Sequence, residues 1–394
     1  MSSPAALTSL LAKSPNMRQT LFHPILREKA ENLAADFQAN YNQQDVPALF
    51  SELNSETNKQ FNTYLSGIEA YRSHPYTRKI DDLPIIWREG NTCLHDYTSL
   101  NEVSENEHPI LLIPSLINRG YIFDLEEKRS FARYLVQHGY PVFLVNWNTP
   151  DEDEKKFNLE NYILRLAQIC QCLIQNTGKV PTILGYCMGG TLATGLTSTF
   201  PELVHSLIAL ATPWDFEADG GKQKAMLSPA FPLMEQQIHA FGQLPTDTLQ
   251  LCFGLLDPML SLKKFTKFSQ LDEQSDQALS FVALEDWLND GVPLAGPTAK
   301  ECLHDWYQEN TPAKGNWLIN GKIVQPQHFN RPSLSIIPMT DRIVPPESAL
   351  ALADILPLNI TLKPSLGHIG MMSGNRAEKL VWDPIIEFLK ALPK

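Results

Sequence analysis

One short string restricts the fold more than any other part of the sequence, and it reads Gly-Tyr-Cys-Met-Gly at residues 185–189. The apolar run PTIL precedes it and TLATGL follows it, which predicts a buried strand, a tight turn and a helix. In such a turn, side chains beside a nucleophile would collide with the adjoining strand or helix. Gly185 and Gly189 are therefore predicted to relieve crowding around Cys187, the predicted nucleophile.

The helix predicted to begin after Cys187 would assist the thiol. Its N-terminus carries partial positive charge, which favours the reactive thiolate. The backbone N–H of Met188 is expected to face an oxyanion that develops during the reaction. The alternative interpretation is a cysteine that only packs in the core after a strand.

Short apolar runs alternate with helical segments on both sides of this turn. Such alternation predicts an α/β fold whose sheet is mostly parallel and covered by helices on both faces. Strands are expected within residues 108–118, 140–151, 180–186, 203–216, 331–346 and 360–370. Helices are expected at residues 129–139, 158–178 and at the C-terminus, with Asn158 as a cap and Gly178 as a stop.

The pattern divides the chain into three parts. Residues 1–84 are predicted to be an N-terminal helical extension, because LREKAENLAADFQANYNQQ has apolar residues at helical spacing. Residues 85–394 are predicted to be the catalytic domain. Residues 217–330 interrupt the alternation of strands and helices, so they are predicted to form a helical cap over the active site.

Two further side chains are predicted to act with Cys187. In the α/β-hydrolase fold the acid and then the histidine follow the nucleophile along the chain, each after a late strand. Asp341 follows SLSIIPMT and His368 follows TLKPSLG, so they are predicted to complete a catalytic triad. His368 would accept the thiol proton and Asp341 would support the imidazolium. A turn aspartate and an exposed loop histidine are the alternatives.

The loop Pro114–Asn118 follows the apolar run HPILLI. In this fold such a loop supplies a second backbone N–H to the oxyanion, and here the donor would be Leu116 or Ile117. A simple turn at the end of a strand is the alternative.

Composition excludes several classes of protein. A net charge of −12 argues against general nucleic-acid binding, which needs a basic face. The six cysteines form no dense disulfide framework and no zinc pattern, so we expect no metal site. The sequence begins without a secretory signal and has no run of 18 apolar residues. A cytoplasmic protein without a transmembrane segment is the expectation.

Several longer strings resemble the polyhydroxyalkanoate synthases, and the similarity runs from about residue 85 to the C-terminus. The matching strings are IPSLINRGYIFDL, LVNWNTPDEDEKKFNLENYI, ILGYCMGGTLA, WLND, WYQEN, LINGKIV, DRIVPPESA and GHIG. The resemblance implies an acyltransferase that polymerises (R)-3-hydroxyacyl-CoA into polyester and releases coenzyme A. Residue by residue, it assigns Cys187 as nucleophile, His368 as base and Asp341 as the partner of the histidine.

The resemblance also implies the molecules with which the chain works. Coenzyme A enters as part of the substrate, and no cofactor is implied. The length of the chain is nearer to that of the smaller synthases, so the expected partners are an accessory synthase subunit or a second copy in a homodimer. The growing polyester and the surface of a polymer granule are the other expected partners.

Two other functions fit the same residues. A thioesterase or an intracellular polyhydroxyalkanoate depolymerase would use the same triad with water as acceptor. A granule-associated protein without catalytic activity would keep the fold for binding alone. The complete set of Cys187, Asp341 and His368 in the expected order argues against the inactive alternative.

Overall fold

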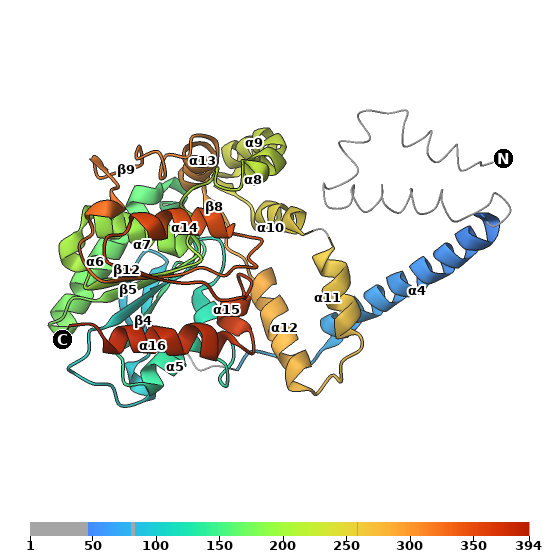
Figure 1. The fold of residues 1–394 in the computed structure, drawn as a ribbon, viewed down its shortest axis with the longest axis horizontal. Coiled ribbons are helices and arrows are strands. Elements are labelled where there is room, and N and C mark those ends of the chain that lie inside the picture. The colour runs from blue at the N-terminus through green and yellow to red at the C-terminus, as the bar shows by residue number, and fades with distance from the viewer. Residues whose placement is uncertain (1–45, 80–82, 258, 394) are drawn as a thin grey trace. The chain divides into compact units, whose positions relative to one another are not determined.

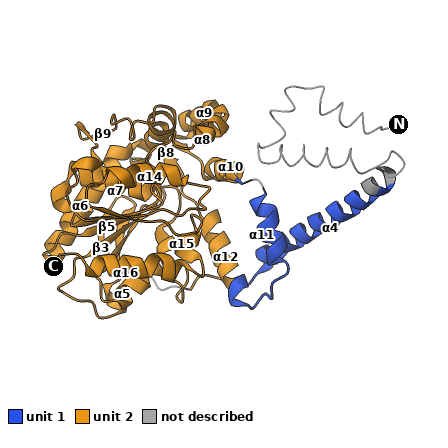
Figure 2. Ribbon diagram, in the orientation of Figure 1, with its two compact units in different colours: residues 1–75, 257–278 blue, residues 76–256, 279–394 orange. Residues whose placement is uncertain are grey.

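The computed structural model describes residues 46–79, 83–257 and 259–393 of the chain. These residues form two compact units (Figure 2). Of the described residues, unit 1 contains 46–75, 257 and 259–278, and unit 2 contains 76–79, 83–256 and 279–393. None of the helices in the described residues is long and apolar enough to cross a membrane.

Unit 2 is built on an eight-stranded sheet with the order β1-β2-β4-β3-β5-β6-β11-β12 (Figure 1). The strands are β1 (Ile85–Glu89), β2 (Thr92–Asp96), β3 (Ile110–Ile113), β4 (Val142–Asn146), β5 (Thr182–Tyr186), β6 (Ser206–Leu210), β11 (Ser333–Ile336) and β12 (Asn359–Leu362). The six strands from β4 to β12 in this order pair in parallel. The predicted mostly parallel sheet is therefore confirmed.

Helices cover both faces of the sheet, as predicted. On one face lie α6 (Leu159–Thr177), α7 (Met188–Thr199) and α14 (Pro346–Ile355), and on the other α5 (Phe131–Gln137) and α16 (Asp383–Lys390) (Figure 1). Along β3, Leu111 and Ile113 join the core under the first group, while Ile110 and Leu112 join the second. Successive side chains of a strand point to opposite faces, so a strand between two helical layers must be apolar throughout.

The remaining segments of unit 2 outside the predicted cap are short. They are η1 (Thr98–Leu100), η2 (Gly120–Asp124), η3 (Glu154–Lys156), η4 (Pro201–Leu203), α15 (Gly370–Ser373) and the π-helix η8 (Glu378–Trp382).

The ends of α6 follow the predicted capping residues. The side chain of Asn158 accepts from the backbone N–H of Asn161, and the side chain of Asn161 accepts from the backbone N–H of Asn158. Gly178 ends the helix at φ 70°, a left-handed conformation that glycine adopts without steric cost.

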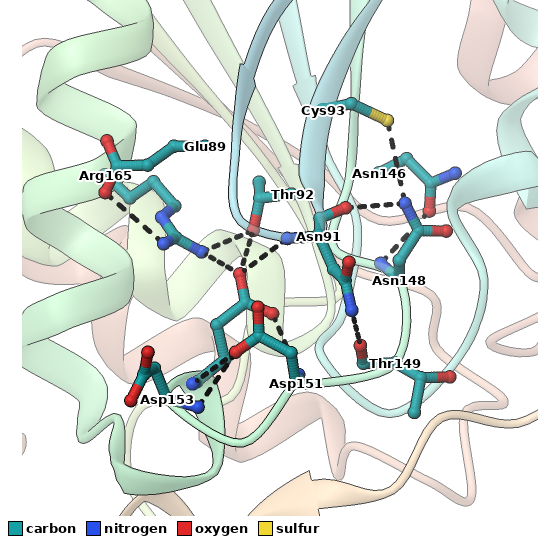
Figure 3. A network of polar contacts seen from close by, with 11 residues as sticks. Glu89, Asn91, Thr92, Cys93, Asn146, Asn148, Thr149, Asp151, Asp153 and Arg165 are labelled. Atoms are coloured by element: carbon teal, nitrogen blue, oxygen red, sulfur yellow. Dashed lines mark hydrogen bonds and ion pairs between the residues drawn. The ribbon is translucent and has the colours of Figure 1, made fainter.

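The antiparallel hairpin of β1 and β2 was not predicted. Its two-residue turn is Gly90-Asn91, with Gly90 at φ 55°, and a Gly-Asn pair between apolar runs is the signal that indicates such a hairpin. Arg165 of α6 forms a buried ion pair with Glu154 and a second ion pair with Glu89 on β1 (Figure 3). Because breaking one partner of a buried pair leaves an uncompensated charge, this network fixes the hairpin to α6.

The range predicted as a cap contains mainly short helices. In unit 2 it holds α8 (Lys222–Leu227), η5 (Ser228–Ala230), α9 (Phe231–Phe241), β7 (Gln243–Leu244), α10 (Thr246–Leu256), β8 (Leu294–Ala295), α13 (Gly296–Glu301), the π-helix η6 (Cys302–Gln308), β9 (Leu318–Ile319), β10 (Lys322–Ile323) and η7 (Pro326–His328). The helix α12 (Asp276–Asn289) carries the chain from unit 1 into unit 2.

Unit 1 joins two segments far apart in the sequence, α4 (Val46–Ser73) and α11 (Leu260–Phe268). The ring of Phe265 contacts the rings of Tyr64 and Tyr71 at centroid distances of 6.2 and 5.8 Å. A Cβ atom on Gly67 would lie 2.0 Å from the backbone oxygen of Phe265, so glycine permits the close crossing. Residues 257 and 259–278, which were predicted to belong to the cap, thus belong to unit 1 together with α4. Residues 76–79 and 83–84, which were predicted to belong to the N-terminal extension, belong to unit 2 together with the sheet. The helix expected within residues 26–44 lies outside the described residues.

Candidate active site

Cys187 lies at the sharp turn between β5 and α7, as the sequence predicts. Its backbone is at φ 55° and ψ −128°, a conformation that costs a non-glycine residue free energy and persists only where the surroundings enforce it. Two hydrogen bonds hold the turn: the N–H of Cys187 donates to Leu210 O at 2.9 Å, and the N–H of Gly190 donates to Cys187 O at 2.9 Å. This places the thiol at the carboxyl end of the parallel strands.

Three glycines allow this turn to pack against its neighbours. A Cβ atom on Gly185 would lie 2.5 Å from Gly190 Cα, and one on Gly189 would lie 2.2 Å from the carbonyl oxygen of Ile113. Gly190, which was not singled out from the sequence, is equally constrained, because its Cβ would lie 1.9 Å from Thr212 Oγ1. The two consecutive glycines at 189 and 190 were the sequence signal that could have indicated the close contact of Gly190 with Thr212.

Asp341 and His368 lie in the loops that follow β11 and β12. Asp341 Oδ2 is 2.6 Å from His368 Nδ1, and both residues are buried. Asp341 Oδ1 accepts the N–H groups of Ile343 and Val344 at 2.7 and 3.0 Å. The side chain of His368 also forms a hydrogen bond with Cys187. The structure thus brings the three predicted triad residues together in the expected order.

Neighbouring charges determine the direction in which the pKa of His368 shifts. Burial alone would lower the pKa of His368, but the charges of Cys187 and Asp341 and hydrogen bonds to both side chains raise that pKa to about 10. The surroundings of His368 therefore favour its imidazolium form at neutral pH.

Tyr186 is a further residue of this site that sequence reasoning missed. Its hydroxyl donates to the backbone oxygen of His368 at 3.2 Å. Its ring is stacked on the imidazole, with a centroid distance of 4.9 Å and an interplanar angle of 30°. Tyr186 therefore holds the loop of His368 against the nucleophile turn. Its place directly before Cys187 was the only signal.

The loop that follows β3 lies beside the turn. Ile117 lines the cavity next to Cys187, whereas the side chain of Leu116 is buried in the core. As the first residue of α7, Met188 has an N–H with no acceptor within its own helix. The N–H of Ile117 lies 3.4 Å from Ser115 Oγ. The assignment of oxyanion donors to Met188 and Leu116 stays a prediction.

The same loop forms hydrogen bonds with the end of α12 and with the residues that follow it. The N–H of Val292 donates to Ile117 O at 2.9 Å, and Trp287 Nε1 donates to Arg119 O at 2.8 Å. Asp290 accepts from Arg119 Nε at 3.2 Å and from the hydroxyl of Tyr121 at 3.2 Å. The strings WLND and INRGYIFDL, which both resemble one family, thus contact each other directly in the structure.

A cavity of about 150 Å³ opens above Cys187. Its walls come mostly from apolar side chains of α8, α9, α10, α13 and η6, together with Phe216 and the residues that follow Asp341. Parts of the predicted cap that belong to unit 2 therefore line the cavity beside the thiol. Such a cavity suits an acyl chain and excludes water from a covalent intermediate.

The described residues contain no group of three or more side chains able to hold a metal ion. All six cysteines lie among them, and each is a free thiol. The chemistry that this arrangement supports is nucleophilic attack by Cys187 with proton transfer through His368.

Comparison with known proteins identifies similar chains. The model of the alpha/beta hydrolase fold family matches residues 108–374. The poly(3-hydroxyalkanoate) polymerase subunit PhaC of Synechocystis sp. is 31% identical over 281 residues, which cover 69% of this chain and 74% of that protein. The subunit PhaC of Haloferax mediterranei is 30% identical over 309 residues, 77% of this chain and 63% of that protein.

Two further comparisons bear on length and fold. The subunit PhaC of Haloarcula marismortui is 31% identical over 285 residues, 71% of this chain and 60% of that protein, so the chain spans less than two thirds of the two haloarchaeal relatives. The solved structure of Rv0554 from Mycobacterium tuberculosis matches with a TM-score of 0.50 and 16% identity, over 77% of this chain and 94% of that chain. This likeness concerns the fold alone.

Proposed function

The chain belongs to the alpha/beta hydrolase fold family and, within it, to the poly(3-hydroxyalkanoate) polymerase subunits PhaC, and from this we propose that it polymerises (R)-3-hydroxyacyl groups of coenzyme A thioesters into polyester. The observation that carries the proposal is the Cys187–His368–Asp341 arrangement beneath an apolar cavity. Coenzyme A is released at each addition, and no cofactor is required.

The first step is acylation of the thiol. The Cys187 thiolate attacks the thioester carbonyl carbon, and the negative charge that develops on the oxygen is stabilised by N–H groups of Met188 and the loop after β3. The carbon–sulfur bond to coenzyme A then breaks, and His368 gives its proton to the departing thiolate. Exchange of one thioester for another costs little free energy, which explains the use of cysteine.

The second step extends the polymer. His368 is now neutral and accepts the proton of an attacking 3-hydroxyl group, while Asp341 stabilises the resulting imidazolium. The hydroxyl oxygen bonds to the acyl carbon, the bond to Cys187 Sγ breaks, and the thiolate pairs again with His368. An apolar cavity favours the alcohol over water as the acceptor.

The partners follow from the same family membership. We infer an accessory synthase subunit or a second copy of the chain as the protein partner, and the surface of a polyester granule as the working location. Because the protein carries a net charge of −12, the phosphates of coenzyme A require a local cluster of basic residues.

Incubation of the purified protein with 3-hydroxybutyryl-CoA tests the proposal. Release of coenzyme A with formation of insoluble polyester supports it. Release of free 3-hydroxybutyrate would instead indicate a hydrolase, and absence of turnover a binding protein. Cys187→Ala should abolish coenzyme A release, and Cys187→Ser should retain a trace because an alcohol is far less acidic than a thiol. Near wild-type turnover in Cys187→Ala would refute the mechanism.

A further inference from the structure

Tyr307 contributes an unpaired hydroxyl group to the cavity that contains Cys187. It lies on the π-helix η6, and its ring packs edge-on against Phe216 at a centroid distance of 5.0 Å. Among the residues that the structure describes, none forms a hydrogen bond with this hydroxyl. A tyrosine hydroxyl in a mostly buried setting normally finds a partner, so its position in the cavity wall points to a ligand. Single π-helical turns are frequent at functional sites.

The other oxygen-bearing side chains of the cavity wall already have protein partners. Asp215 Oδ1 accepts from Asn310 Nδ2 at 2.8 Å, and Ser348 Oγ accepts from Trp214 N at 3.2 Å. The remaining contacts are those of Asp219 with the N–H groups of Lys222 and Gln223, and of Gln223 Nε2 with Ile343 O. Tyr307 is therefore the oxygen-bearing side chain of the cavity wall that has no hydrogen-bond partner among the described residues.

The hydroxyl is suited to donate. Burial raises the pKa of Tyr307, and the nearby charge of Cys187 raises it further, so the phenol stays protonated. Burial likewise raises the pKa of the Cys252 and Cys302 thiols, which leaves both as weak donors. A good donor in a mostly apolar wall helps to orient a chain that has one polar group. Trp306 Nε1, whose residue also lines the cavity, is buried without a hydrogen-bond partner among the described residues.

We propose that the Tyr307 hydroxyl donates a hydrogen bond to the 3-hydroxyl oxygen of the acyl chain in the cavity and thereby selects hydroxyacyl over unsubstituted acyl thioesters. The inference rests on the proposed function, because it takes the hydroxyacyl thioester as the substrate. A 3-hydroxyacyl chain carries its hydroxyl two carbons from the carbonyl that Cys187 attacks. A hydroxyl oxygen can accept this hydrogen bond without losing its own proton, so recognition by Tyr307 requires no proton transfer.

The test compares two thioesters and two side chains. Single-turnover release of coenzyme A, with enzyme in excess, measures acylation of Cys187 by 3-hydroxybutyryl-CoA and by butyryl-CoA, which lacks the hydroxyl. We expect the wild-type protein to favour the hydroxyacyl thioester on the order of tenfold, as for one neutral hydrogen bond. In Tyr307→Phe this ratio should fall to about one, mainly because the hydroxyacyl reaction slows.

One control and one additional variant separate recognition from structure. Tyr162→Phe removes the hydroxyl of another buried tyrosine, one packed against Trp147 and Phe157 away from the cavity wall, and should leave the ratio unchanged. Tyr307→Leu should also bring the ratio to about one, which provides a second variant if Tyr307→Phe does not fold.

Three results would overturn the inference. They are a wild-type ratio near one, an unchanged ratio in Tyr307→Phe, and an equal slowing of both thioesters, which indicates a structural role. Wild-type acylation that ends in free acid would refute polymerisation alone, because the ratio still decides the role of Tyr307. Absence of acylation by either thioester would refute both proposals.

Discussion

Replacement of Gly189 by alanine should damage both the fold and the reaction, and the size of the effect follows from one contact. The new Cβ atom would lie 2.2 Å from the carbonyl oxygen of Ile113 and 2.7 Å from that of Pro114, whereas ordinary contacts begin at 3.4 Å. The turn or the end of β3 must therefore move by about 1 Å, and both opposing atoms belong to backbone. Overpacking of this kind costs about 1–3 kcal/mol.

The displacement acts on the reacting groups directly. The backbone at Ile113 and Pro114 leads into the loop beside Cys187, so the variant separates the nucleophile from that loop. A misplacement of about 1 Å at a reacting centre costs on the order of 100-fold in rate. We therefore expect single-turnover acylation by butyryl-CoA to fall about 100-fold, and the urea midpoint to fall with the stability.

Gly370→Ala is the matched control for this substitution. Gly370 is close to His368 in the chain, but a Cβ atom there would have no heavy atom within 4 Å. The same chemical change should therefore leave acylation and the urea midpoint nearly unchanged. If Gly189→Ala proves as active and as stable as Gly370→Ala, the close packing of the nucleophile turn is not what the reaction requires.

Three further predictions concern the proton carrier and the loop beside it. Asp341→Asn should still form an acyl-enzyme, detected by intact mass, while steady polymer growth falls by orders of magnitude. His368→Ala should form no acyl-enzyme and no polymer. Equal loss of the acyl-enzyme in both variants would contradict separate roles. Because the pKa of His368 is raised from 6.5 to about 10, its imidazole C–H resonances should stay at their protonated positions through neutral pH. Cys187→Ala removes a neighbouring charge and should lower the pKa of His368. An unchanged titration in this variant would contradict the charge argument. Asp290→Ala removes an acceptor shared by Arg119 and Tyr121 and should slow acylation several-fold at nearly constant stability. Equal rates would show that this contact does not hold the loop.

Much of the sheet and of the triad was predictable from sequence because the signals are local. The apolar runs that become β3 to β6 are followed by glycine, proline or polar turns, and Asn158 and Gly178 bound α6 through contacts within a few residues. Asp341 and His368 were found in the same way, since each follows a late strand.

Features that depend on distant contacts could not be predicted. Tyr186 was not assigned because its contact with the His368 backbone joins residues 182 apart in the sequence. The string that contains Tyr307 indicated only family similarity, and its place beside Cys187 depends on how the cap folds back. The hairpin of β1 and β2 is different, because its Gly90-Asn91 turn was a local signal that was overlooked.

The pairing of α4 with α11 bears on how the chain is made. The hydroxyl of Tyr64 lies 3.3 Å from Ser261 Oγ, across 197 residues of sequence. At ~5–20 residues per second, a ribosome needs roughly 10 to 40 s to synthesise the intervening chain. During that time the aromatic residues of α4 exist without their partners in α11. The nascent chain therefore leaves Tyr64 and Tyr71 without their contacts to α11 until the later segment has been made and unit 1 can close.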